Sequence, residues 1–192
     1  DHVNSTLSYA PKPDKSRLVN VASDFLTSNG YTEIMSNSLS KAGYYETSAS
    51  YPVERCVKIM NPLSQDLNVM RQTLLFNALE AVELNVNRRN QNLRMYEVGN
   101  CYSFNSEKLN DEDALAKYEE SYRLGITITG LASQPSWNSK AEGASFFTLR
   151  GIVERLLRRF GIDIYALQCE SLDCDLYADA ILFKQGPKEV LR

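Results

Sequence analysis

The chain has 192 residues, a formal net charge of −3, 43% hydrophobic residues and 23% charged residues. This balance is typical of one globular domain with its own core, and the negative charge argues against binding of nucleic acid by bulk electrostatics. No run of about 18 apolar residues occurs, and the first residues lack the pattern of a signal peptide. We therefore expect a cytoplasmic protein without membrane contact.

The two ends of the chain differ from the predicted domain. Residues 1–13 are polar and contain Pro11 and Pro13, which predicts an extended lead-in. The domain itself is expected to comprise residues 14–192. Its last residues, 188–192, resemble the start of a further strand, so we expect the chain to be a fragment of a longer protein.

The first predicted element is a helix over residues 15–29. Apolar side chains recur there at helical spacing, with Asp14 as the candidate N-cap and Gly30 as the residue that ends the helix. Two strands are predicted next, over residues 31–39 and 56–60. A loop that contains glycine, proline and several serines separates them.

The longest helix is predicted over residues 68–89, where apolar residues recur at spacings of three and four. A long strand is predicted over residues 93–104. An acidic stretch, 105–121, separates it from the clearest strand, 122–131, in which apolar residues alternate with polar or small ones. This alternation predicts that one face of the sheet lies on the core and the other on a polar surface.

A third helix is predicted over residues 145–160, with Gly161 at its end, and two strands follow over residues 162–170 and 177–184. The predicted order is αββαββαββ. Strands in neighbouring pairs with a few long helices indicate an α+β fold, in which helices pack on one face of an antiparallel sheet.

The usual sequence patterns of an active site are missing. The four cysteines form no CxxC pair, the only histidine is His2, and neither GxGxxG nor GxxxxGK[ST] occurs. Two acidic groups, residues 111–113 and Asp173 with Asp175, carry carboxylates of the kind that binds magnesium or transfers protons. Charged runs beside loops are typically solvated, so we predict no catalytic, cofactor-binding or metal-binding residue in this chain.

Arginines gather in two places. The first group is a candidate for contact with RNA, because guanidinium forks match phosphate oxygens; it consists of Arg88, Arg89 and Arg94. The second group lies off the apolar stripe of the third predicted helix, where arginines mostly provide solubility and partner contacts; it includes Arg155, Arg158 and Arg159.

Three segments together carry a resemblance to a known family. The first is Asn61-Pro62-Leu63-Ser64 with Asp66, Met70 and Arg71, leading to Asn85-Val86-Asn87-Arg88. The second is Leu93-Arg94-Met95-Tyr96-Glu97-Val98-Gly99, and the third is Trp137 followed by Phe146-Phe147-Thr148-Leu149-Arg150-Gly151. Their order and spacing over residues 14–185 resemble the signatures of bacterial phenylalanyl-tRNA synthetase β subunits. Thr148 and Asn100 depart from the family, which often has an acidic and a basic residue there.

The resemblance implies a class II aminoacyl-tRNA synthetase-like fold, an antiparallel sheet flanked by helices. In that family this module is a degenerate relative of the catalytic domain, and the α subunit carries the working site. Class II sites rely on an arginine just after the second-motif strand to hold the ATP α-phosphate. Residues 99–104 contain no arginine, and a glycine-rich third motif is not visible before Arg192.

The implied function is structural: the module docks against the α subunit in an (αβ)₂ heterotetramer and supports ATP-dependent attachment of phenylalanine to tRNA(Phe). The module itself would hold no cofactor, whereas the whole enzyme would use ATP and Mg²⁺. By resemblance, Leu18, Val21 and Phe25 of the first helix are candidates for partner contact, although the same stripe could serve the module's own core. Two other hypotheses stay open: an autonomous amino-acid-activating ligase domain, and a tRNA-binding module that uses the first arginine group.

The matched residues also carry structural expectations. Pro62 biases Asn61 away from helix, which predicts a strand-to-helix corner. Ser64 or Asp66 would then cap the long helix.

A charged residue in a half-buried strand needs a partner, so we expect Glu97 to pair with an arginine such as Arg71 or Arg88. Gly99 is predicted to mark a bulge or a close backbone approach. Gly151 is predicted to pack closely against the sheet, which would compensate for its cost of about 1 kcal/mol in a helix.

Overall fold

The computed structural model describes residues 6, 14–108, 113 and 115–191. Its helices are α1 (Lys15–Ser28), α2 (Leu75–Asn87) and α3 (Phe146–Arg159). Its strands are β1 (Thr32–Glu33), β2 (Leu39–Ser40), β3 (Val69–Met70), β4 (Arg94–Phe104), β5 (Tyr118–Ile128), β6 (Leu131–Ser133), β7 (Glu142–Gly143), β8 (Gln168–Ser171), β9 (Ile181–Gln185) and β10 (Lys188–Leu191). None of the helices in this part of the chain is long and apolar enough to cross a membrane.

The long β4–β5 ribbon is the centre of the fold. The two strands pair antiparallel along their whole length, from Arg94 opposite Ile128 to Phe104 opposite Tyr118. The short strand β1 adds in parallel to the other edge of β4, and β8, β9 and β10 form a second antiparallel sheet. The predicted α+β class is therefore confirmed, with one parallel pair that was not expected.

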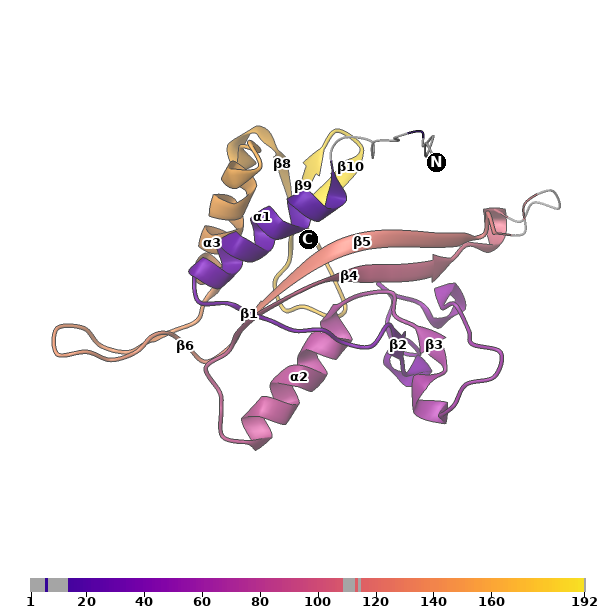
Figure 1. Cartoon of the computed structure of the whole chain (residues 1–192), viewed down its shortest axis with the longest axis horizontal. Helices are drawn as coiled ribbons and strands as arrows, with labels where there is room; N and C mark the ends of the chain where they lie inside the picture. The colour runs from indigo at the N-terminus through magenta and orange to yellow at the C-terminus, as the bar shows by residue number, and fades with distance from the viewer. Residues whose placement is uncertain (1–5, 7–13, 109–112, 114, 192) are drawn as a thin grey trace, which may run out of the picture.

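Helices lie on both sides of the ribbon. In Figure 1, α1 and α3 lie on one side of β4 and β5, and α2 lies on the other. The expectation that helices pack on one face only is wrong. The second face is covered because residues 31–74 cross it and place Arg71 and Leu74 over the strands, as described below.

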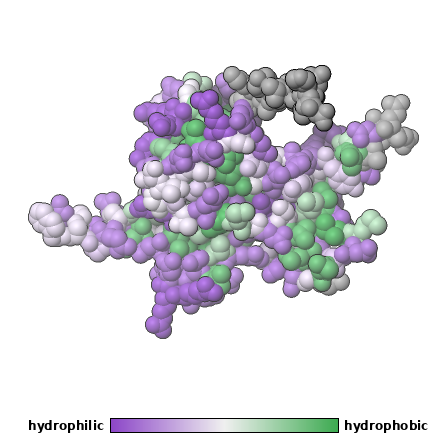
Figure 2. All heavy atoms as spheres, viewed as in Figure 1, coloured by the Kyte–Doolittle hydropathy of each residue, from purple (hydrophilic) through white to green (hydrophobic). Residues whose placement is uncertain are grey.

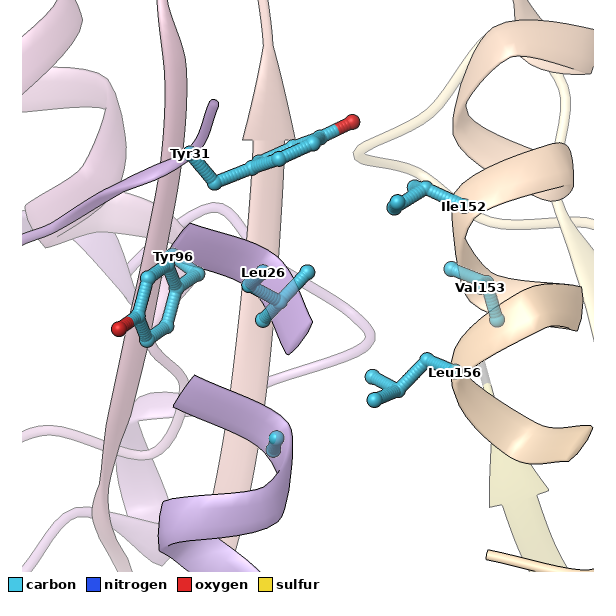
Figure 3. Close-up of a cluster of buried hydrophobic side chains, with 7 residues drawn as sticks. Leu26, Tyr31, Tyr96, Ile152, Val153 and Leu156 are labelled. Atoms are coloured by element: carbon cyan, nitrogen blue, oxygen red, sulfur yellow. The ribbon is translucent and has the colours of Figure 1, made fainter. Parts of the chain in front are cut away.

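The main core fills the space between α1, α3 and the first face of the ribbon. Ala22 and Leu26 come from α1, and the buried residues of α3 are Ile152, Val153 and Leu156. Figure 3 shows these α3 side chains pointing toward Leu26 and Tyr31. The core also includes Tyr96 of β4 and packs against three residues of β5, namely Leu124, Ile126 and Ile128. These alternate positions confirm the predicted apolar face of that strand.

Local signals place the ends of α1 and α3. Asp14 Oδ1 accepts a hydrogen bond from the Ser16 amide at 2.9 Å, and Gly30 follows α1 with a φ of +80°. Ser145 forms a capping box with Thr148 at the start of α3. Gly161 follows α3 with a φ of +77°, a conformation that glycine adopts without steric cost. Both helices thus agree with their predicted ranges to within one residue at each end.

The two strands predicted between α1 and α2 are wrong in extent. Residues 31–39 form two short strands, β1 and β2, because the chain between them turns to donate the Ser36 amide to Glu97. Residues 56–60 make only one isolated bridge, between Lys58 and Val69.

The long helix also starts later than predicted. Val69 and Met70 belong to β3, where they pair with Ser40 and Leu39. The following amide of Arg71 donates to Ser38 at 2.9 Å. Helix α2 therefore begins at Leu75 rather than at residue 68.

Part of the stretch predicted as an acidic spacer is strand. β5 begins at Tyr118, four residues earlier than predicted, because Glu119 and Glu120 pair across the ribbon with Ser103 and Tyr102. Of residues 111–113, only Asp113 lies within the described residues, and it is exposed.

The C-terminal strands are shorter than predicted. Residues 162–170 open with a 3₁₀-helix, Ile164–Ala166, before β8 begins at Gln168. β9 begins at Ile181 rather than at residue 177. The strand expected to start at residue 188 is present as β10 and pairs with β9.

Candidate functional site

A buried ion pair occupies the second face of the ribbon. Arg71 Nη1 donates to Glu97 Oε1 at 2.6 Å, and Arg71 Nε donates to the Asn100 carbonyl at 2.9 Å. Glu97 Oε1 also accepts the Ser36 amide at 3.1 Å. The side chains of Arg71 and Glu97 are only 3% and 5% exposed. The predicted pairing of Glu97 with an arginine is confirmed for Arg71, whereas Arg88 is exposed at the end of α2.

Two glycines make room for the side chains that cover this face. A Cβ atom on Gly99 would overlap the Arg71 guanidinium, and one on Gly125 would lie 3.4 Å from Leu74. Gly99 does mark a close approach, but neither the predicted bulge nor a neighbouring backbone is found there: the strand pairing is continuous, and the approaching group is the Arg71 side chain. Because Arg71 and Leu74 occupy the space above β4 and β5, this face is filled by the chain itself.

The residues on this face do not fit an ATP site. Residues 99–104 supply no arginine, and Arg123, which pairs opposite Gly99, is exposed and donates to Ser121 Oγ at 3.1 Å. The buried cation on the face, Arg71, is already neutralised by Glu97. Within the described residues, no group of three or more histidine, cysteine or acidic side chains could hold a metal ion.

Asn61 and Pro62 belong to a projecting turn. We call Met60, Asn61, Pro62 and Leu63 the 60–63 corner. The chain on either side of the turn is held together by two backbone hydrogen bonds, from Ile59 to Asn68 at 2.9 Å and from Met70 to Val57 at 2.8 Å. Met60 is 93% exposed and Leu63 is fully exposed.

The predicted role of the 60–63 corner as the start of the long helix is wrong. Ser64 Oγ accepts the Asp66 amide at 3.1 Å and thereby caps the 3₁₀-helix Gln65–Leu67 instead of α2. That short helix leads into β3, since the chain must first pair with β2 before α2 can begin.

The candidate residues of α1 divide between core and surface. Phe25 packs against the main core, and Val21 is half-buried. Leu18 is 42% exposed and is the most accessible of the three. The stripe therefore serves the module's own core along most of the helix.

Of the three arginines predicted to contact RNA, two lie on an exposed turn and one lines a cavity. Arg88 and Arg89 are exposed at the C-terminal end of α2, and Arg89 has a φ of +65°. Arg94, at the start of β4, lines a cavity of about 520 Å³ and donates to the Ala132 carbonyl. Asn90 lines the same cavity and follows Arg89 directly in sequence.

A family model described as the phenylalanyl tRNA synthetase beta chain CLM domain matches residues 3–177. The chain belongs to this family. The phenylalanine–tRNA ligase beta subunit of Bacteroides fragilis is 42% identical over 93% of the chain, and that of Porphyromonas gingivalis is 41% identical over 99%. The chain spans 22% and 23% of the length of these two relatives.

The fold of this CLM-domain chain resembles that of a class II synthetase. A crystal structure of pyrrolysyl-tRNA synthetase from Desulfitobacterium hafniense superposes with a TM-score of 0.61 at 16% identity. The match covers 91% of this chain and 56% of that chain. The predicted class II-like fold is therefore confirmed.

Two features of the CLM domain escaped sequence reasoning. Asp175 joins loops that are far apart in sequence, because its carboxylate accepts the Ala49 amide at 2.7 Å and the Ser50 amide at 3.2 Å. No local pattern in the sequence marks that contact. The expectation for Gly151 is wrong, since a Cβ atom at this position would meet nothing within 4 Å.

Proposed function

We propose that this chain is a non-catalytic docking module of a phenylalanine–tRNA ligase β subunit. It binds the α subunit, contributes to an (αβ)₂ heterotetramer and thereby supports ATP-dependent attachment of phenylalanine to tRNA(Phe). The observation that carries the proposal is the filled second face of the ribbon, where Arg71 lies over Gly99 and Leu74 over Gly125. A sheet face occupied by the chain's own side chains leaves no space there for ATP and an amino acid, so ATP and Mg²⁺ belong to the whole enzyme.

The 60–63 corner is the surface proposed for docking. Met60 and Leu63 expose large apolar side chains, and Met35, between β1 and β2, is also 93% exposed. Figure 2 shows hydrophobic residues gathered over the part of the molecule that carries β2 and β3 in Figure 1. Methionine and leucine adapt to an irregular partner surface, and exposed apolar groups of this kind mark protein interfaces.

The backbone of the corner supports this role. The hydrogen bonds of Ile59 and Met70 fix the base of the turn, so binding would not have to order a loose loop. Leu18 of α1 is the alternative point of contact, because it is the exposed member of the helix candidates.

The test is co-expression of the chain with a phenylalanine–tRNA ligase α subunit from the same source, followed by size-exclusion chromatography and titration. The double variant Met60→Glu/Leu63→Glu is expected to weaken the complex at least tenfold, since it places two charges in an apolar contact. Leu18→Glu is the matched variant on α1. If only Leu18→Glu abolishes binding, the docking surface lies on α1 instead. If the unaltered chain forms no complex with the α subunit, the proposed function is refuted.

The enzymatic alternative is tested by ATP–pyrophosphate exchange with the isolated chain and phenylalanine. No exchange above the background is expected, because the buried cation on the second face, Arg71, is paired with Glu97. Exchange that disappears in the variant Arg71→Met would show that this face is catalytic after all.

A further inference from the structure

The cavity beside Arg94 is not used by the docking function and has the features of a ligand site. Its volume of about 520 Å³ lies within the range of roughly 300–1,000 Å³ that ligand pockets cover. It is bounded by β1, the end of α2, the start of β4 and the chain around β6. The residues that line it are Gly30, Thr32, Ile34, Asn85, Asn90, Asn92, Leu93, Arg94, Met95, Leu131, Ala132 and Gln134.

The charge of Arg94 is uncompensated within the described structure. No described carboxylate lies within ion-pair distance of its guanidinium, which is half-buried and bonds only to the Ala132 carbonyl. None of the described residues that line the cavity is acidic. A partly buried cation without a counter-ion is costly unless it serves a ligand, so the cavity favours an anionic group.

A second cation strengthens the positive field at this end of the core. Burial raises the pKa of the Tyr31 phenol, while the charges of Arg94 and Arg155 oppose this rise. Both guanidinium groups therefore lie close enough to act on one phenol that is next to Gly30, a residue of the cavity wall.

The rest of the lining suits a nucleotide. The side chains of Thr32 and Gln134 make no hydrogen bond to another described residue, so they are free to bind a sugar or a base edge. Ile34 and Leu131 are partly exposed and form the apolar wall, whereas Leu93 and Met95 are buried and only back the lining. Proteins bind unpaired RNA bases through side chains that hydrogen-bond to the base edges and through stacking on aromatic rings or on an arginine guanidinium, and Arg94 is the lining residue that can stack in this way.

The approach to the cavity is also basic. Arg88 and Arg89 are exposed on the turn that leads to Asn90. Arg89 is the only described non-glycine residue with a positive φ, at +65°, and the turn is held by an Asn90 to Asn85 backbone hydrogen bond of 2.9 Å. The turn thus places the backbone of two exposed cations directly before Asn90 of the cavity wall, within reach of phosphates that neighbour a bound nucleotide.

We propose that this cavity binds one nucleotide of a single-stranded RNA, with a phosphate on Arg94 and the base against the apolar wall. The inference does not depend on the docking function, because it concerns a different surface. It requires RNA binding that is sensitive both to the charge of Arg94 and to the open volume beside it.

The experiment is fluorescence anisotropy of a labelled single-stranded RNA oligonucleotide titrated with the 192-residue chain. Arg94→Gln removes the charge, and Thr32→Trp fills the cavity without altering Arg94. Each variant is expected to weaken binding at least tenfold. Arg94→Gln should also make the slope of log affinity against log salt shallower, by the amount that one phosphate contact contributes. Arg159→Gln, which removes an exposed arginine from α3, is the matched control and should change affinity less than twofold.

Equal weakening by all three variants would indicate non-specific electrostatics and would overturn the proposal. Unaltered binding by Thr32→Trp would do the same, even if Arg94→Gln failed to fold. Adenosine monophosphate is added as a competitor to distinguish an RNA strand from a free nucleotide as the ligand. It should compete only weakly with the RNA. Binding of adenosine monophosphate without any binding of RNA would overturn the assignment to an RNA strand.

Discussion

Arg71 and Glu97 form a salt bridge with an N–O distance of 2.6 Å, and the Arg71 side chain crosses Gly99 to reach its partner. The second carboxylate oxygen of Glu97 is buried and has no hydrogen-bond partner among the described groups. One carboxylate oxygen of Glu97 is therefore well bonded, whereas the free-energy cost of removing the other oxygen from water is not compensated. Such a pair fixes the arrangement of the segment that carries Arg71 more than it adds to net stability.

Replacement of Glu97 by alanine is expected to destabilise the chain strongly. It would leave the Arg71 charge buried without a partner, which costs about 3–5 kcal/mol in free energy of unfolding. Urea denaturation followed by circular dichroism measures the loss. The control is Glu119→Ala, which breaks the exposed pair of Glu119 with Lys108 and should cost less than about 1 kcal/mol. Similar losses in both variants would show that burial does not set the strength of the Arg71–Glu97 interaction.

The two glycines Gly99 and Gly151 should respond in opposite directions to alanine. At Gly99 the new methyl group displaces the Arg71 guanidinium, which is held by Glu97 and the Asn100 carbonyl, so a loss of about 1–3 kcal/mol is expected. At Gly151 the methyl group meets nothing, and the helix should gain about 0.5–1 kcal/mol. Thermal unfolding of both variants tests the pair. A stabilising Gly99→Ala would contradict the close approach of Arg71.

Local sequence predicted the elements whose limits are set locally. The ends of α3 follow from the Ser145 capping box and from Gly161, and β4 follows from a segment rich in aromatic and β-branched residues that lies in the centre of the sheet. Glu97 was also predictable, because a carboxylate in a buried strand requires a cation.

The remaining errors arise where distant contacts override local pattern. Val69 and Met70 fall within the helix predicted over residues 68–89, yet they form a strand because β2 pairs with them. Glu119 and Glu120 have the composition of a loop, but they extend β5 because β4 continues opposite them. The identity of the arginine that pairs with Glu97 likewise required the path of the chain over Gly99.

Leu26 of α1 should be far more important for stability than Leu18 on the same helix. Leu26 is fully buried between α1 and the ribbon, whereas Leu18 is 42% exposed. Leu26→Ala is expected to lower the free energy of unfolding by about 2–5 kcal/mol because it leaves a cavity. Leu18→Ala should cost less than about 1 kcal/mol. Chemical denaturation compares them, and a large cost at Leu18 would mean that this side chain serves the module's core rather than a partner.

Asp175 is expected to make the chain sensitive to acid. Hydrogen bonding to Ser50, together with the Ala49 amide, lowers the pKa of Asp175 from 3.8 to about 2 in the folded chain. Because the unfolded state binds the proton more readily, this carboxylate contributes stability above pH 3.8 and loses that contribution as the pH falls toward about 2. The stability of the unaltered chain should therefore fall over this interval.

Asp175→Asn removes the titrating group while keeping the shape of the side chain. Its unfolding midpoint in urea should be lower than that of the unaltered chain at pH 5, and the difference should shrink as the pH approaches 2. The matched control is Asp173→Asn, since Asp173 is exposed and makes no hydrogen bond to another described residue. If the two variants show the same dependence on pH, the contact between the Ala49–Ser50 loop and Asp175 does not stabilise the folded state. If only Asp175→Asn changes the dependence of stability on pH, the hydrogen bonds of this one surface carboxylate stabilise the contact between the C-terminal segment and the loop that precedes the 60–63 corner.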